Sequence, residues 1–248
     1  MFRLSGKYTL ITGGTTGIGF ETAKKFHAEG AHVAITGNNP ETLDFSQKFF
    51  GKDVWVISSD SGSFAAQTIL RDTIKARWPR IDALFLNAGI VTSHKLEEES
   101  EESFDRLMSI NLKGPFFLLQ SLLPLLANPS SVILCGSVSG HIGKSGTSAV
   151  YSASKGALLA LGRALAAEFL DRQIRVNSIS PGPIMTPAFD KLGLDNTQRV
   201  YQEVSAMIPV GRLGTPADVA DTAVFFASDE SRFLLGTDII VDGGMINV

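Results

Sequence analysis

The stretch Leu10–Phe20, LITGGTTGIGF, joins a short apolar run to the beginning of an amphipathic pattern. Its eight central residues contain four glycines and three threonines. Glycine costs roughly 0.5–1 kcal/mol relative to alanine inside regular structure, so this cluster indicates that another group approaches the backbone closely. In open α/β sheets, the turn between the first strand and its helix presents free N–H groups to an anion.

The spacing of the glycines narrows the class of ligand. A P-loop has Lys and then Ser or Thr after its last glycine, but Phe20 and Glu21 stand there. Kinase chemistry is therefore disfavoured. The G-x-G-x-x-G fingerprint does not match either, because Gly13, Gly17 and Gly19 are spaced in the opposite order. Taken alone, the stretch could also be a tight strand-to-helix connection.

Short β-rich runs alternate with amphipathic segments along the whole chain. This alternation predicts an α/β fold, a doubly wound Rossmann-type parallel sheet of about seven strands with helices on both faces. We expect strands at Tyr8–Thr12, His32–Thr36, Val54–Ser58, Ala83–Asn87, Val132–Cys135, Arg175–Ile179 and Asp238–Val241. We expect helices near 17–29, 41–50, 63–78, 100–126, 150–171 and 215–227.

The chain is expected to form one domain over residues 1–248. An insertion at about 183–212 interrupts the alternation and is expected to act as a substrate lid. Its apolar residues favour a fairly apolar substrate, although they could equally pack the lid on the body. They are Ile184, Met185, Phe189, Leu192, Leu194 and Met207.

Composition and charge exclude several classes of protein. With 248 residues, 44% of them hydrophobic, the chain can bury a large core. The net charge of −3 gives no basic surplus for nucleic acid, and the apolar run at 114–127 is interrupted and too short to span a membrane. The single cysteine, Cys135, excludes an internal disulfide, and no secretory signal is visible, so we expect a cytoplasmic protein.

Local signals explain two groups of polar residues without a metal site. Ser100 and Thr215 are expected to cap helices, and the acidic run at 97–102 then complements a helix dipole. His94 and His141 fall in loops, where single histidines are usually solvated. Because the four histidines lack metal-ligand spacing, we expect no catalytic metal.

Further motifs follow the glycine-rich turn in order. They are Thr12-Gly13-x-x-x-Gly17-x-Gly19, Asn87-Ala88-Gly89, Asn111, Ser137, Tyr151-x-x-x-Lys155 and Pro181-Gly182. Over essentially the whole chain, this order resembles the short-chain dehydrogenase/reductase family. The resemblance implies an oxidoreductase that interconverts a carbonyl and a secondary alcohol with a nicotinamide cofactor.

The catalytic residues implied by the resemblance centre on one helix face. Tyr151 and Lys155 are four residues apart, so their side chains are neighbours, and an ammonium there attracts a phenolate. The resemblance gives Tyr151 the proton transfer, Ser137 the substrate oxygen, Lys155 the ribose hydroxyls and Asn111 a water linked to that lysine. Ser137 precedes Tyr151 by fourteen residues, one more than is usual in the family, so Ser139 remains an alternative.

The resemblance also assigns the cofactor contacts. Gly37 stands where NAD-dependent relatives usually carry Asp, and Asn38 where NADP-dependent relatives often carry Arg. We expect NADP(H) to be preferred and NAD(H) to be possible. The expected contacts are Gly13, Thr15, Thr16, Gly17, Ile18, Gly19, Asn38, Asp60, Asn87, Ala88, Gly89, Tyr151, Lys155, Pro181, Gly182, Ile184 and Thr186.

Two functions remain open at this stage. The first is an NAD(P)(H)-dependent oxidoreductase, and the second is a dinucleotide-binding sensor or regulator of the same fold that has lost turnover. The intact set of Asn111, Ser137, Tyr151 and Lys155 favours the enzyme. The resemblance further implies a small-molecule carbonyl or alcohol as substrate and assembly into a homotetramer.

Overall fold

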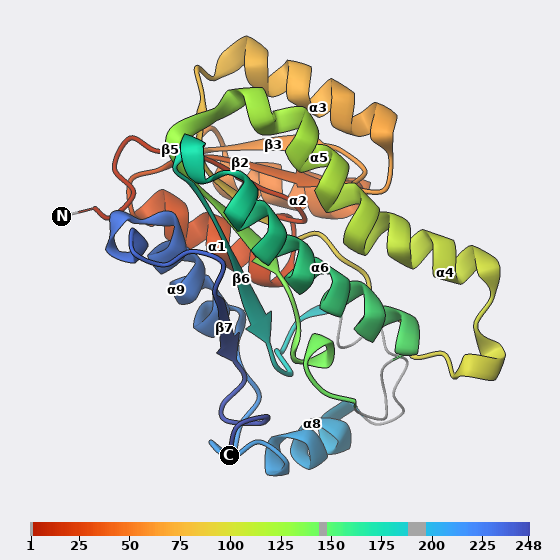
Figure 1. The fold of residues 1–248 in the computed structure, drawn as a ribbon. Coiled ribbons are helices and arrows are strands. Elements are labelled where there is room, and N and C mark those ends of the chain that lie inside the picture. Colours follow the sequence, from red (N-terminus) through yellow and green to blue (C-terminus); the bar gives the residue numbers. More distant parts are fainter. Residues whose placement is uncertain (1, 144–147, 188–196) are drawn as a thin grey trace.

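The computed structural model describes residues 2–143, 148–187 and 197–248. They form a seven-stranded sheet in the order β3-β2-β1-β4-β5-β6-β7, and all neighbouring strands are parallel. Helices cover both faces of the sheet (Figure 1), so the predicted doubly wound fold is confirmed. The strands are β1 (Tyr8–Ile11), β2 (His32–Gly37), β3 (Val54–Ser58), β4 (Ile81–Leu86), β5 (Leu126–Cys135), β6 (Ile174–Pro181) and β7 (Asp238–Val241).

Each face of the sheet has its own apolar core. Phe26, Phe85 and Phe226 belong to the core under one helical layer, and Leu84 and Val132 to the core under the other. Burial on both faces explains why the strands read as nearly continuous apolar runs. The first layer consists of α1 (Gly17–Ala28), α2 (Pro40–Phe50) and α9 (Pro216–Ala227), and the second of α3 (Phe64–Arg77), α5 (Gly114–Leu122) and α6 (Ala149–Glu168).

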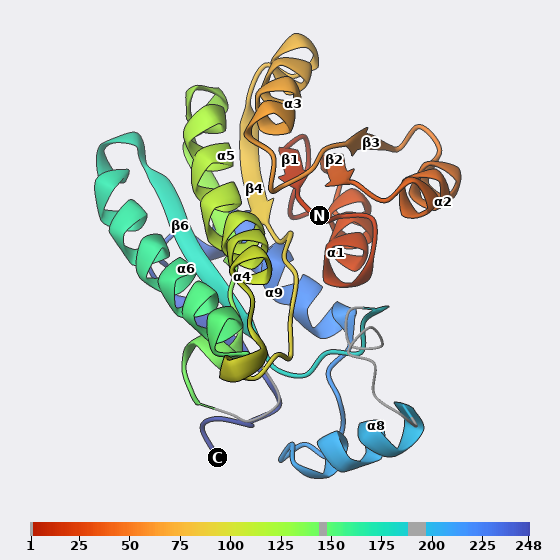
Figure 2. The same cartoon turned by 90° about the vertical axis from the view of Figure 1, so that its right-hand side faces the viewer.

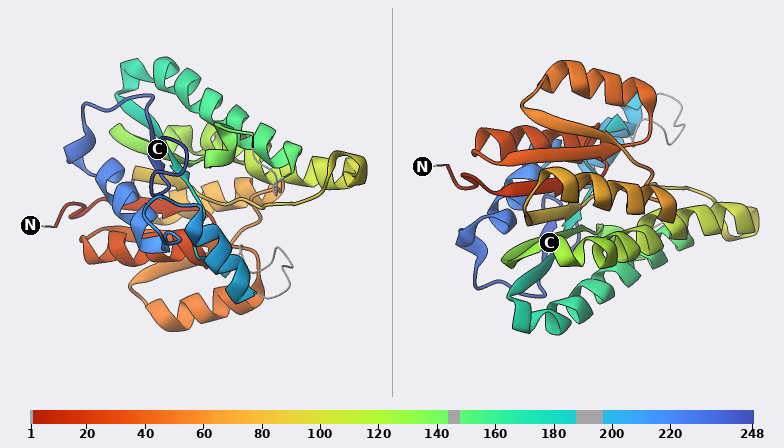
Figure 3. Two further views of the ribbon diagram at one scale, coloured as in Figure 1. Left: turned by 90° about the horizontal axis from the view of Figure 1, so that it is seen from below. Right: turned by 90° about the horizontal axis from the view of Figure 1, so that it is seen from above.

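The views in Figures 2 and 3 show how the helices flank the sheet. Helix α1 lies against α9, and α3 lies against α5. The short helix α8 (Thr197–Ala206) lies apart from both layers, below the end of the sheet. Within the described residues, no helix is both long and apolar enough to span a membrane.

The helix expected over 100–126 is not one regular helix. It consists of α4 (Glu101–Met108), a π-helical turn (Ser109–Lys113) and α5. At the junction, a Cβ on Gly114 would lie 2.2 Å from the carbonyl oxygen of Ser61. The helix therefore passes the connection after β3 too closely to carry a side chain there. Such π turns occur where a helix is locally deformed, and they are frequent at functional sites.

Strand β5 begins earlier than the apolar run alone predicts. It starts at Leu126 rather than Val132, because Leu126 pairs with Ile81 before a shift in register. Residues 127–131, between Leu126 and Val132, are partly polar, so a hydrophobicity pattern does not detect this part of the strand. Other strand ends fall close to the predicted positions.

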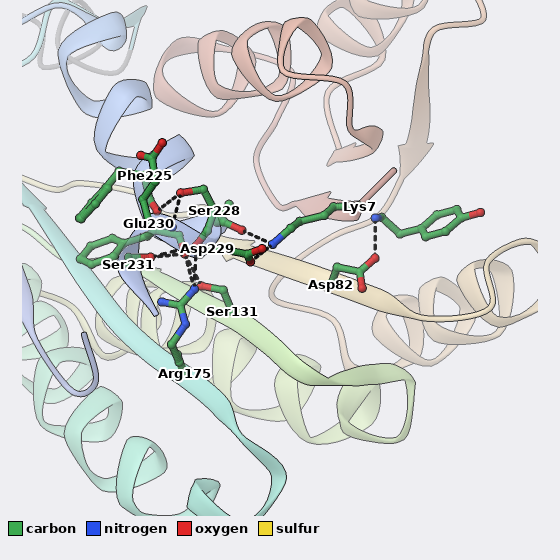
Figure 4. A network of polar contacts seen from close by, with 12 residues as sticks. Lys7, Asp82, Ser131, Arg175, Phe225, Ser228, Asp229, Glu230 and Ser231 are labelled. Carbon is green, nitrogen blue, oxygen red and sulfur yellow. Dashed lines mark hydrogen bonds and ion pairs between the residues drawn. The ribbon is translucent and has the colours of Figure 1, made fainter. Parts of the chain in front are cut away.

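A polar network lies at the amino-terminal ends of the strands (Figure 4). Arg175 Nη2 donates to the carbonyl oxygens of Phe226 (2.9 Å) and Ser228 (3.2 Å) at the end of α9. Ser131 Oγ donates to the same Phe226 oxygen at 2.8 Å. Burial lowers the pKa of Arg175, but a cation at this helix end is favourable because it complements the helix dipole. The network fastens α9 to β5 and β6.

The strand order reverses at β1, which has β2 on one side and β4 on the other. In open α/β sheets, ligands bind at such a point, outside the carboxyl ends of the strands. The loops after β1, β4, β5 and β6 leave this edge of the sheet. They carry most of the residues that the sequence marks as a site.

Candidate functional site

The glycine-rich turn between β1 and α1 forms a cradle with no room for side chains. Gly13 (φ +62°) and Gly17 (φ +54°) adopt backbone conformations that favour glycine. A Cβ on Gly19 would lie 2.3 Å from the carbonyl oxygen of Gly13. The side chain of Thr16, the N-cap of α1, makes no capping hydrogen bond, and the described first turn of α1 contains no acidic residue. Free N–H groups without a nearby acid fit a phosphate, so the turn suits the pyrophosphate of a dinucleotide.

The segment after β4 holds this turn in place. Asn87 Nδ2 donates to the carbonyl oxygens of Thr12 (3.0 Å) and Gly13 (3.1 Å). The backbone N–H groups of Asn87 and Ala88 both donate to Thr12 Oγ1 at 3.0 Å. The Asn87-Ala88-Gly89 motif is therefore a support for the glycine-rich turn, and the side chain of Asn87 is occupied by that role.

Tyr151 and Lys155 lie one turn apart near the start of α6. The helix begins directly after its N-cap, Ser148, whose Oγ accepts a hydrogen bond from the backbone N–H of Tyr151 at 3.1 Å. Lys155 is buried, and its Nζ lies 5.8 Å from the centre of the Tyr151 ring. The same Nζ donates to the carbonyl oxygen of Cys135 at 2.7 Å. One ammonium thus joins the end of β5 to the tyrosine.

The pKa of the Cys135 thiol depends on burial and on two charged groups near the end of β5. Burial raises the pKa of Cys135, the Lys155 ammonium opposes that shift, and the Asp238 carboxylate adds to it. A buried thiol of raised pKa is a poor nucleophile. Cys135 therefore contributes a backbone oxygen to the site, in agreement with its predicted place in a buried strand.

Asn111 lies in the π-helical turn and is almost fully buried. Its Oδ1 accepts from the backbone N–H of Ile90, and its Nδ2 donates to the carbonyl oxygen of Ile90, both at 2.9 Å. Nδ2 also lies 3.3 Å from Ser154 Oγ, beside Lys155 on α6. The side chain thus links the loop after β4 to the helix that carries Tyr151.

Ser137 follows the end of β5 and begins a short 3-10 turn, η4 (Val138–Gly140). Its Oγ accepts from the backbone N–H of Ser139 at 3.2 Å, and the residue is buried. A Cβ on Gly140 would lie 3.0 Å from the backbone of Lys155 and Gly156. The turn bearing Ser137, and the alternative Ser139, is therefore pressed against α6 close to Lys155.

The ends of β2 and β3 carry the residues expected at the adenosine side. A Cβ on Gly37 would lie 2.6 Å from Thr15 Oγ1, and Thr42 Oγ1 donates to that oxygen at 3.0 Å. Asn38 is exposed. Asp60 is also exposed, and its carboxylate accepts from the Gly62 N–H at 2.9 Å.

The segment after β6 returns to the glycine-rich turn. Pro181 ends β6, and the Gly182 N–H donates to the carbonyl oxygen of Val241 at 2.9 Å. Ile184 then pairs with Gly214. Beyond it, the Thr186 methyl lies 3.3 Å from the position of a Cβ on Gly17. Pro181-Gly182, Ile184 and Thr186 therefore lead from β6 to the start of α1.

The expected lid lies only partly within the described residues. Phe189, Leu192 and Leu194 are outside them. Among the described members, Ile184 is buried, whereas Met185 and Met207 are 48% and 62% exposed. Two apolar side chains are thus available to a ligand or to a covering surface.

The start of α9 fixes the strand-like pair made by Ile184 and Gly214. Thr215 caps the helix in a capping box with Asp218, and Ser100 caps α4, as predicted. Arg212 binds the Asp218 carboxylate with two hydrogen bonds, of 2.8 and 3.0 Å. These bonds, with one from the Thr215 backbone, hold the pKa of Asp218 far below its ordinary value.

This capping box makes stability depend on pH. A carboxyl whose folded pKa is depressed stabilises the fold above its unfolded pKa, about 4, and loses that effect as the pH falls. We expect Asp218→Asn to lower the urea midpoint at pH 7, and the difference from the wild type to narrow below about pH 4. The exposed Asp171→Asn is the control and should change little. An undiminished difference at pH 3 would contradict the assignment.

His141 lies in a turn and is exposed, as the sequence predicts, but its side chain makes contacts that the sequence does not predict. Its Nε2 lies 2.7 Å from Asp238 Oδ2 and 3.2 Å from Ser180 Oγ. No signal in the sequence joins His141 to a residue 97 positions away. Across the described ranges, no group of three or more His, Cys, Asp or Glu side chains could hold a metal ion.

Comparison with known proteins gives this arrangement a family. Residues 13–246 match the family model described as Enoyl-(Acyl carrier protein) reductase. The chain is 40% identical to the uncharacterized oxidoreductase YxbG of Bacillus subtilis, over 99% of this chain and 93% of that protein. It is 35% identical to the 3-oxoacyl-[acyl-carrier-protein] reductase FabG of Thermotoga maritima, over 98% and 99% of the two chains.

The name of a third relative states which cofactor that enzyme depends on. The chain is 34% identical to the NADP-dependent (R)-specific alcohol dehydrogenase of Lentilactobacillus kefiri, over 98% of this chain and 97% of that protein. The family model and these relatives span nearly the full length of the sequence. The chain therefore belongs to the short-chain dehydrogenase/reductase family and is an NAD(P)(H)-dependent oxidoreductase acting on CH–OH and C=O groups.

Proposed function

We propose that this protein interconverts a small-molecule carbonyl and a secondary alcohol, with Tyr151 as the acid and base. The observation that carries the proposal is the buried Lys155 ammonium, which donates to the Cys135 carbonyl oxygen and lies 5.8 Å from the centre of the Tyr151 ring. A lysine is almost never buried unless it is paired or has a function. The hydroxyl of Tyr151 is the proton donor in reduction and the acceptor in oxidation.

The other residues have supporting roles in this scheme. A nicotinamide cofactor supplies or accepts the hydride. Ser137 donates a hydrogen bond to the substrate oxygen, where negative charge develops in the transition state. Lys155 stabilises the phenolate left when Tyr151 gives up its proton. Asn111 orders the loop after β4 against α6, through Ile90 and Ser154.

The substrate class rests on two features. FabG of Thermotoga maritima is named for a 3-oxoacyl substrate and the Lentilactobacillus enzyme for an alcohol, which supports a ketone or secondary alcohol here. The exposed Met185 and Met207, in the segment expected to form the lid, support a fairly apolar substrate. The direction of the reaction then follows the ratio of reduced to oxidised cofactor.

A substrate panel tests the reaction class. We expect ketones of increasing size to oxidise NADPH in the presence of the protein, which absorbance at the nicotinamide band measures. The competing function, a sensor of the same fold, predicts binding without consumption across the panel. If the purified protein binds the nucleotide but consumes none with any ketone or alcohol, the proposed interconversion of a carbonyl and an alcohol fails.

The end of β2 supports a preference for NADP(H). An acid at position 37 would bond the ribose 2′-hydroxyl of NAD and repel the 2′-phosphate of NADP. Thr15 leaves no space for a side chain at position 37, so no carboxylate at that position repels the 2′-phosphate. The exposed Asn38 and the hydroxyls of Thr15 and Thr16 are neutral groups that a phosphate tolerates.

The cofactor preference has a direct kinetic test. We expect a higher kcat/KM with NADPH than with NADH, and we expect Asn38→Arg to widen the difference because a cation attracts the 2′-phosphate. Asn38→Gln, which stays neutral, is the matched control. Equal or higher efficiency with NADH in the wild type would overturn the preference.

We also propose that the protein assembles as a homotetramer. An apolar groove of about 350 Å³ lies on the outer side of the second helical layer, and apolar surface of this kind is typical of subunit contacts. Light scattering measures the assembly directly. The groove is lined by Met108, Leu112, Lys113, Phe116, Phe117 and Leu161.

A further inference from the structure

The turn that carries Ser137 is fastened on two sides. On one side, Gly140 packs so closely on α6 that a Cβ there would lie 3.0 Å from the Gly156 nitrogen. On the other side stands His141, the residue directly after η4, whose backbone N–H donates to the Val138 carbonyl oxygen at 2.9 Å. The side chain of His141 leaves the turn toward the last two strands of the sheet.

The contacts of His141 are specific to one ring atom. Nε2 lies 2.7 Å from Asp238 Oδ2 on β7 and 3.2 Å from Ser180 Oγ on β6. The side chains of His141 and Asp238 are 28% and 16% exposed, and His141 as a whole residue is exposed. Nε2–H donates a hydrogen bond to the Asp238 carboxylate, and in a neutral imidazole this bond places the ring proton on Nε2.

The Asp238 carboxylate is largely buried. Its other oxygen, Oδ1, is buried without a hydrogen-bond partner among the described residues. Burying an unpaired carboxylate oxygen costs free energy, so His141 Nε2–H is a valuable partner. A strong, directional hydrogen bond at this place fixes the position of the imidazole, and hence of the turn.

From this geometry we infer that His141 is a positioning residue for Ser137. It ties the turn η4 to β6 and β7, so that the Ser137 hydroxyl keeps its position relative to α6, the helix that carries Tyr151 and Lys155. Asp238 orients the imidazole, and Ser180 limits its sideways movement. The inference rests on the proposed function, because it gives Ser137 a task that depends on precise placement.

The choice of substitutions follows from the ring atom involved. Glutamine places an amide nitrogen near the position of Nε2, whereas asparagine places one near the position of Nδ1. His141→Gln should therefore retain the bond to Asp238, and His141→Asn should lose it. Both are neutral and similar in polarity, so the pair separates the hydrogen bond from a general change at the loop.

The expected kinetic result is a split between the two variants. A small misplacement of a catalytic group can cost up to about 100-fold in rate. We expect His141→Asn to lower kcat about tenfold or more, with an unchanged dissociation constant for the nucleotide. His141→Gln should remain near the wild type. Equal activity of His141→Asn and the wild type would overturn the inference.

A double-mutant cycle connects the effect to Ser137. Residues that act as one unit show non-additive effects, so His141→Asn should cause little further loss in a Ser137→Ala background. Fully additive losses would overturn the positioning role. A wild-type rate for Ser137→Ala alone would instead disprove the proposed role of Ser137, which distinguishes the two failures.

A third measurement needs no turnover. In a ¹H–¹⁵N spectrum of the ligand-free protein, the Nε2–H of His141 should appear as a slowly exchanging signal that disappears in His141→Gln. Asp238→Ala should accelerate its exchange, with the unfolding midpoint recorded to verify folding. A proton found on Nδ1 alone would contradict the hydrogen bond on which the inference depends.

Discussion

Tyr151→Phe is expected to lower kcat by roughly 10²–10⁴-fold, the contribution of a well-placed general acid or base. The substitution removes one oxygen atom and keeps the ring that faces Lys155 Nζ at 5.8 Å. Without the hydroxyl, no side-chain proton is available to the substrate oxygen at this position. Steady-state kinetics with NADPH and the best ketone of the panel measures the loss.

Two measurements make this result specific to the proton transfer. The dissociation constant for the nucleotide, followed by fluorescence, should change little because the glycine-rich turn is intact. Tyr8→Phe is a matched control at the amino-terminal end of β1, where the centres of the Tyr8 and His32 rings lie 4.7 Å apart. A variant Tyr151→Phe with near-normal turnover would disprove the role assigned to the hydroxyl.

Lys155→Met should reduce kcat/KM by at least about 100-fold. For an ammonium and a phenolate about 4–6 Å apart, an effective dielectric constant near 20 makes the attraction about 3–4 kcal/mol. Methionine fills nearly the same volume without the charge, so packing under α6 is retained. Rates and nucleotide affinity are both expected to fall, because the expected role of Lys155 includes holding the ribose hydroxyls of the cofactor.

Arginine is not expected to rescue this position. Lys155 is buried and its Nζ lies 2.7 Å from the carbonyl oxygen of Cys135, so a larger guanidinium has little space. Lys155→Arg should therefore remain impaired although it keeps the positive charge. Lys48→Met, which removes an exposed lysine paired with Asp44 on α2, is the control for loss of a charge. Full activity of Lys155→Met would remove the basis of the proposed mechanism.

The fold could be predicted because its signals are local. Buried parallel strands are short apolar runs, and the glycines at 13, 17 and 19 mark a junction that tolerates no side chains. The caps at Ser100 and Thr215 could be predicted for the same reason, since each involves residues three positions apart. The pairing of Tyr151 with Lys155 follows from one turn of helix.

The features that were missed depend on contacts between distant segments. The π turn at Ser109–Lys113 lies where α5 passes Ser61, and the early start of β5 depends on Ile81 in another strand. Neither neighbour is visible in the sequence around these elements. The side-chain contacts of His141 were missed because its partners come from β6 and β7.

The amino-acid sequence by itself determined the order of strands and helices, the glycine-rich turn and the residues capable of proton transfer. These properties are set within a few residues, by periodicity, backbone freedom and side-chain chemistry. Only the tertiary structure decided that Thr15 occupies the space beside Gly37, that Thr186 returns to Gly17, and that His141 meets Asp238. Such contacts form when the chain closes on itself, and close packing then admits only one arrangement of the side chains.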